Sequence, residues 1–245
     1  MIDAIRSEWI KVSTVTVTWV LTVVAVLFPL VITVLTTAFA DNVWRGEELA
    51  SLVTGLTIVS AMLLAVVSTI SVTSEFSHNT IRPTFAAMPD RIRPLVAKVV
   101  VQLAMALVVV TATVIACWVL GAIVSGDSPD LGDGTALPAM VGVVLLAVGL
   151  SLLGYGLGLL IRNSAAAVCM LLLWPLIAEG LIAGLLSAIG FEDLVRFLPY
   201  ASGINMAVTE PDPESLGRVG GGLYFYAWVV VIAALGVLSA RKRDA

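Results

Sequence analysis

Residues that could do chemistry are few in this sequence. His78 is the only histidine, and the two cysteines, Cys117 and Cys169, lie in separate apolar stretches. A zinc site needs several imidazole, thiolate or carboxylate ligands at close spacing, and a nucleophilic triad needs a histidine base. Since neither a His-based metal site nor such a triad can be assembled here, the sequence predicts no catalytic residue and no metal site.

The chain also shows no means of binding a nucleotide. The pattern G-x-x-x-x-G-K-[ST] is absent, and the triplet Gly220–Gly222 is not followed by a lysine. Buried acid–base pairs of the kind used by proton-coupled carriers are missing as well. We therefore expect no cofactor in this chain, and a transporter built from it would need an energy source in a partner.

Glu179 is the only acidic residue within a predicted membrane span. Placing a charge in a bilayer costs at least about 2.5–3.5 kcal/mol, so such a residue usually has a defined role. Pro175, four residues earlier, can bend the helix because it leaves the carbonyl of Leu171 without its partner. Two interpretations stay open. Glu179 and Pro175 belong to a translocation path or gate, or Glu179 lies near the outer interface and hydrogen-bonds a neighbouring helix.

The most distinctive polar segment covers residues 73–98. Pro83, Pro89 and Pro94 divide it, and proline favours the first turn of a helix and disrupts its interior. The interval between the first two prolines predicts a short helix that carries Phe85 and Met88 outward. Exposed apolar side chains on such an element favour a protein contact. The alternative is a plain basic loop that only enforces topology.

Residues 1–14 predict an amphipathic helix in the cytoplasmic membrane interface. Ile2, Ile5, Trp9 and Val12 share one helical face, which places the charged residues elsewhere on the surface, among them Glu8 and Lys11. The alternative is a frayed leader.

Six long apolar stretches must position these polar segments. The composition is 60% hydrophobic and 12% charged, whereas soluble domains average about 25% charged residues. A helix crosses the bilayer with about 20 apolar residues, and its backbone must be hydrogen-bonded internally. We therefore predict an all-α, polytopic membrane protein with one domain over residues 15–245 and an outer segment at 191–220. The predicted spans are 15–40, 50–72, 99–125, 135–161, 164–191 and 219–240.

The basic residues predict that both termini are cytoplasmic, by the positive-inside rule. With this orientation, three basic residues face outward: Arg45, Arg196 and Arg218. Ten face inward: Arg6, Lys11, Arg82, Arg91, Arg93, Lys98, Arg162, Arg241, Lys242 and Arg243. Few lysines and abundant Ala, Val and Gly favour a bacterial source, hence the bacterial plasma (inner) membrane.

Nearly the whole chain resembles a permease subunit of the type-2 family of ATP-binding-cassette (ABC) exporters. The resemblance rests on SEWIK near the N-terminus, TSEFSHNTIR from Thr73, AAMPDR followed by Lys98, LGYGLGLLIRN at the end of the fourth span, and the long outer segment. Asn79 stands where the family usually has glycine.

The resemblance implies that a coupling helix between spans 2 and 3 docks on a separate ATPase. By position, the coupling residues are Glu75, Phe76, His78, Thr80, Ile81, Arg82, Phe85 and Met88, with Arg91 and Arg93 able to add charge contacts. Glu8, Trp9 and Lys11 would belong to a connecting helix. ATP and Mg²⁺ would be bound by two copies of the ATPase, beside a second permease subunit that is a copy or a paralogue.

These features predict a permease of an ATP-driven exporter, in contact with the lipid bilayer and not with nucleic acid. The alternative is a non-transport membrane sensor or scaffold that binds a cytoplasmic partner through the same segment. A carrier that works alone or an intramembrane enzyme is a further possibility. A permease should be encoded beside an ATPase, whereas a scaffold need not be.

Overall fold

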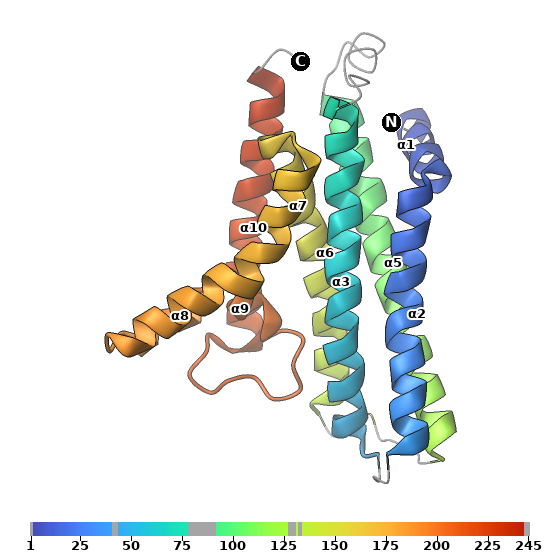
Figure 1. The fold of residues 1–245 in the computed structure, drawn as a ribbon, viewed down its shortest axis with the longest axis vertical. Helices are drawn as coiled ribbons and strands as arrows, with labels where there is room; N and C mark the ends of the chain where they lie inside the picture. Colours follow the sequence, from blue (N-terminus) through green and yellow to red (C-terminus); the bar gives the residue numbers. More distant parts are fainter. Residues whose placement is uncertain (1, 41–43, 78–91, 127–130, 132–133, 243–245) are drawn as a thin grey trace.

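The computed structural model describes residues 2–40, 44–77, 92–126, 131 and 134–242. Within these ranges all regular structure is helical (Figure 1). The elements are α1 (Ile2–Thr14), α2 (Thr16–Phe39), α3 (Gly46–Ser77), α5 (Ile92–Ser125), α6 (Ala136–Ile161), α7 (Ser164–Leu173), η2 (Trp174–Ala178), α8 (Glu179–Ala188), η3 (Glu192–Phe197), α9 (Pro199–Ile204) and α10 (Gly217–Lys242).

Among the described residues, six helical segments are long and apolar enough to cross a membrane, which confirms the predicted all-helical membrane fold. The fifth comprises α7, η2 and α8 together. Helix α1 and the last turns of α10 lie at the same end of the bundle as the last turn of α3 (Figure 1). The six spans of the described residues thus begin and end on the same side of the membrane.

Two spans are longer than their apolar stretches. Helix α3 continues to Ser77 and α5 already begins at Ile92, so both extend into the segment predicted at 73–98. Pro94 lies in the first turn of α5, where its missing N–H costs no helical hydrogen bond. The predicted short helix between Pro83 and Pro89 lies outside the described residues.

Helices α3 and α6 form the centre of the bundle, and glycines allow them to approach closely. A Cβ atom on Gly154 of α6 would lie only 2.5 Å from the carbonyl oxygen of Ala65 in α3. On Gly158, it would lie 3.2 Å from the carbonyl oxygen of Thr69. The small residues at this spacing thus set the distance between two backbones.

Replacing Gly154 with alanine should therefore destabilise the bundle by about 1–3 kcal/mol, the usual cost of overpacking. Gly184→Ala in α8 is the matched control, because nothing lies within 4 Å of its added Cβ atom. Thermal unfolding of both variants in detergent measures the difference. Equal midpoints for Gly154→Ala and the control would show that α3 and α6 are not packed this tightly.

The fifth span is bent near its middle. Trp174–Ala178 forms a π-helical turn that includes Pro175, and α8 then diverges from the other helices (Figure 1). Leu181 and Leu185 of α8 are 69% and 62% exposed. The outer segment folds back through η3 and α9, and Arg218 fixes it by donating to the carbonyl oxygens of Met206 and Thr209.

Candidate functional site

Four charged side chains from three helices meet between α1, the last turns of α3 and the first turns of α5. Lys98 Nζ lies 2.7 Å from Glu8 Oε2 and 3.0 Å from Glu75 Oε1. Lys11 Nζ lies 2.6 Å from Glu8 Oε1 and 2.8 Å from Glu75 Oε1. Each lysine therefore bridges both glutamates. We call these four residues the ionic cluster.

The ionic cluster is largely withdrawn from solvent. The side chains of Glu8 and Lys98 are only 3% and 5% exposed, and that of Glu75 is 13% exposed. Buried charges are tolerated only when they are paired, and two carboxylates here balance two ammonium groups. Removing any one of the four side chains would leave an uncompensated charge, so the cluster holds α1, α3 and α5 together.

Lys11 forms the open edge of the cluster, with its side chain 44% exposed. Partial burial alone would lower the pKa of its ammonium group. The hydrogen bonds and negative charges of Glu75 and Glu8 outweigh that effect and raise the pKa above its usual value. Lys11 is therefore fully charged at neutral pH, and its contribution to stability is lost only in strong alkali.

The prediction that Glu8 lies on the surface of the amphipathic helix is wrong. Helix α1 buries Ala4, Glu8 and Val12, which are spaced four residues apart and so share one helical face. Trp9 and Ile2 are 55% and 82% exposed and point away from the bundle. Glu8 can be buried on this face because the ammonium group of Lys98 pairs with its carboxylate.

Further contacts anchor the end of α3 that carries Glu75. The guanidinium of Arg162 lies 4.9 Å from the ring centroid of Phe76, and the same side chain donates to the carbonyl oxygen of Ser239 in α10. Ser164 Oγ lies 2.7 Å from Thr73 Oγ1. The last turn of α3 is thereby connected to α10 and to the turn between α6 and α7.

The start of α5 is held separately. Tyr155 is 1% exposed, and its hydroxyl donates to the carbonyl oxygen of Leu95, 2.9 Å away. This bond connects the middle of the bundle to the turn of α5 that carries Lys98. Both helix ends that flank residues 78–91 are thus fixed to the bundle, one through Phe76 and one through Leu95.

The structure brings together three of the residues singled out from the sequence, namely Glu8, Lys11 and Glu75. Arg93 is exposed in the first turn of α5. The other coupling residues lie outside the described residues: His78, Thr80, Ile81, Arg82, Phe85, Met88 and Arg91. Lys98 contributed to the family resemblance but was not predicted as a site residue. The signal for it in the sequence was a single lysine near the start of an apolar helix.

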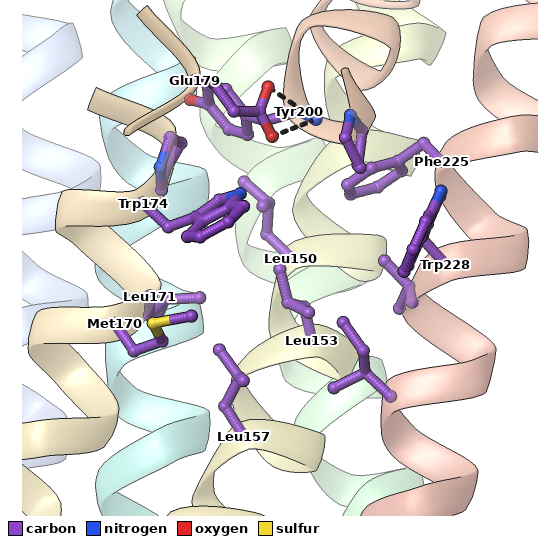
Figure 2. Close-up of a pocket in the computed structure, with 14 residues that line it drawn as sticks. Leu150, Leu153, Leu157, Met170, Leu171, Trp174, Glu179, Tyr200, Phe225 and Trp228 are labelled. Atoms are coloured by element: carbon purple, nitrogen blue, oxygen red, sulfur yellow. Dashed lines mark hydrogen bonds between the residues drawn. The ribbon is translucent and has the colours of Figure 1, made fainter. Parts of the chain in front are cut away.

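Glu179, the first residue of α8, lies in a different part of the fold from the ionic cluster. Its side chain contacts the start of α9. Its carboxylate accepts hydrogen bonds from the backbone N–H of Tyr200, at 2.9 and 3.1 Å (Figure 2). It also accepts one from the backbone N–H of Ala201, at 3.0 Å. The residue is 4% exposed. The carboxylate therefore caps the first turn of α9, whose N–H groups have no helical partner. This geometry matches the interpretation in which Glu179 hydrogen-bonds a neighbouring helix; whether it also serves transport stays a prediction.

Replacing Glu179 with glutamine should loosen α9. Glutamine keeps one carbonyl oxygen but presents an NH₂ donor to a backbone N–H, and a lost charged hydrogen bond costs about 1.5–3 kcal/mol. Hydrogen exchange at the amides of Tyr200 and Ala201 should accelerate. Glu192→Gln in η3 is the control, because Glu192 is exposed. Unchanged exchange at both amides would show that the carboxylate does not hold α9.

A family model described as "ABC-2 family transporter protein" matches residues 4–191. The chain belongs to the ABC-2 transporter family. The match includes all four residues of the ionic cluster and the first five spans, whereas α10 lies beyond it. No curated protein sequence matches the chain. Membership makes this ABC-2 protein a multi-pass membrane permease, the membrane component of an ABC transporter system that carries no catalytic site itself.

Proposed function

We propose that this ABC-2 protein is the membrane-spanning subunit of an ATP-driven exporter that is coupled to a separate ATPase. The observation that carries the proposal is the ionic cluster, which joins α1 to both helix ends flanking residues 78–91. A segment that transmits movement from a partner must be attached firmly to the membrane helices. A loosely attached loop would bend instead, and the spans would not move.

In this account, residues 78–91 dock on the ATPase, and Arg82, Phe85 and Met88 provide the main contacts. ATP-driven association of two ATPase subunits would shift the docked segment. Since Glu75 and Lys98 are paired with both charged residues of α1, the shift would move α1, the end of α3 and the start of α5 together. The spans would then rock between two arrangements as rigid bodies.

The proposed assembly contains two ATPase subunits, which bind ATP and Mg²⁺, and a second permease subunit, either a copy of this chain or a paralogue. The resemblance to ABC exporters, which implies two permease subunits per transporter, supports the second subunit. The orientation rule supports cytoplasmic termini, which would place the ionic cluster on the side where ATP is available.

Purification of the tagged chain from its native membrane in mild detergent tests this function. We expect a stoichiometric ATPase with a phosphate-binding loop to accompany it. Isolation of the chain alone, or with an unrelated partner, would contradict the proposal and favour a sensor or scaffold. A Gly184→Ala chain, changed on the exposed side of α8, serves as a control for handling.

A further inference from the structure

A second feature of the bundle has no part in coupling. A cavity of about 280 Å³ lies between α6, the fifth span, α9 and α10. Leucines of α6 form its floor, Met170 and Trp174 line one side, and Trp228 lines the other (Figure 2). It runs lengthwise from Leu157 to Glu179, which caps α9 at its far end.

The irregular turn of the fifth span coincides with this cavity. Trp174 and Pro175, which begin the π-helical segment, both line it. An inserted residue widens a helix and redirects its continuation, and such turns are frequent at functional sites. The cavity thus lies at the bend of the fifth span, between that span and α10.

The walls of the cavity offer almost nothing to a polar ligand. Glu179 is the only ionisable carboxyl among the lining residues, and its oxygens already accept three hydrogen bonds from the backbone of α9. Water needs two to four polar partners to be retained in a cavity, and the surface of this cavity is almost entirely apolar, with polar groups only on Trp174, Trp228, Tyr200 and Glu179. The cavity therefore selects for hydrocarbon.

The cavity is open on the flank of the bundle. Met170, Trp174 and Trp228 at its rim are 42%, 42% and 45% exposed, whereas Leu150, Leu171 and Phe225 inside it are 2%, 4% and 1% exposed. All six belong to helices that are long and apolar enough to span a membrane. At this depth the medium outside the rim is lipid, which supplies flexible chains of matching chemistry.

We propose that this cavity binds one acyl chain of a membrane phospholipid, inserted between the fifth and sixth spans. The chain fills the space that the bent fifth span leaves, and it contacts Leu150 and Phe225, which bulk lipid does not reach. This inference goes beyond the proposed function and does not depend on an ATPase.

Reconstitution into vesicles that contain a phospholipid with a diazirine on one acyl chain tests the proposal. After illumination, mass spectrometry should find the label on peptides at Leu150 and Phe225 as well as on lipid-facing positions. Val53, which is fully buried and does not line this cavity, should stay unlabelled. Labelling of Leu150 and Phe225 no stronger than that of Val53 would overturn the proposal.

A pair of variants on α10 provides the control. Ile232 lines the cavity, whereas its neighbour Val231 is 51% exposed and does not. Ile232→Trp should fill the space and reduce labelling at Leu150 by about tenfold, while Val231→Trp should leave it unchanged. Leu153→Phe provides a milder filling if Ile232→Trp does not fold. Equal labelling in the folded filling variant, or labelling by a single-chain amphiphile but not by phospholipid, would refute a phospholipid chain as the occupant.

Discussion

Replacing Lys98 with methionine is expected to destabilise the protein by about 3–5 kcal/mol, the cost of removing one partner from a buried ion pair. Glu8 Oε2 lies 2.7 Å from Lys98 Nζ and has almost no access to solvent. Methionine preserves the volume and removes the charge, so Glu8 would keep only Lys11, which is already shared with Glu75. Thermal and denaturant unfolding in detergent would measure the loss.

The double variant Glu8→Gln with Lys98→Met separates charge pairing from packing. The double variant lacks both charges of the Glu8–Lys98 pair, so neither is left without its partner. The double variant should therefore lose less stability than the sum of the two single variants' losses. Arg6→Met, at an exposed position of the same helix, should have little effect. If the single losses simply add, Glu8 and Lys98 do not stabilise each other.

Replacing Arg82 or Phe85 with alanine should weaken ATPase binding by about 30-fold, which corresponds to the loss of about 2 kcal/mol typical of arginine and aromatic residues at the centre of an interface. The resemblance places both residues in the coupling helix, although they lie outside the described residues. Binding of the purified ATPase to the permease in lipid nanodiscs would measure the change.

Arg45→Ala and Phe191→Ala are the matched controls for this pair. Both residues are exposed and were predicted on the outer side of the membrane. Neither control should alter ATPase binding, and all four variants should insert and unfold like the parent. Parental binding by both Arg82→Ala and Phe85→Ala would remove residues 78–91 from the coupling surface.

The six spans could be predicted from the sequence because the bilayer imposes a strict condition. Each stretch must be apolar over its length and must satisfy its own backbone, and helices do both. The ends of α3 and α5 could not be placed in this way. Apolar content falls at Glu75 and Lys98, yet both helices continue, because the two charges find partners on α1.

The ionic cluster shows where inference from the sequence ends. The resemblance singled out Glu8, Lys11 and Glu75, but helical periodicity placed Glu8 on the surface, since periodicity treats every charge as solvated. Lys98 lies 90 residues from Glu8, and only the tertiary fold brings them together. Similarly, the partner of Glu179 is the backbone about twenty residues further on, in a segment that the sequence analysis describes only as a long outer segment.

The most direct test of the central claim is the distance between spin labels on α1 and α3 in the complete transporter. Ile10 and Ser77 are exposed positions on these helices, and Cys169, an exposed native cysteine, would first be replaced with serine. We predict that ATP changes the distance between Ser77 labels on the two permease subunits but leaves the distance from Ile10 to Ser77 within one subunit unchanged. A change in that internal distance when ATP binds would contradict the account, because α1 and the end of α3 would then not move as one body.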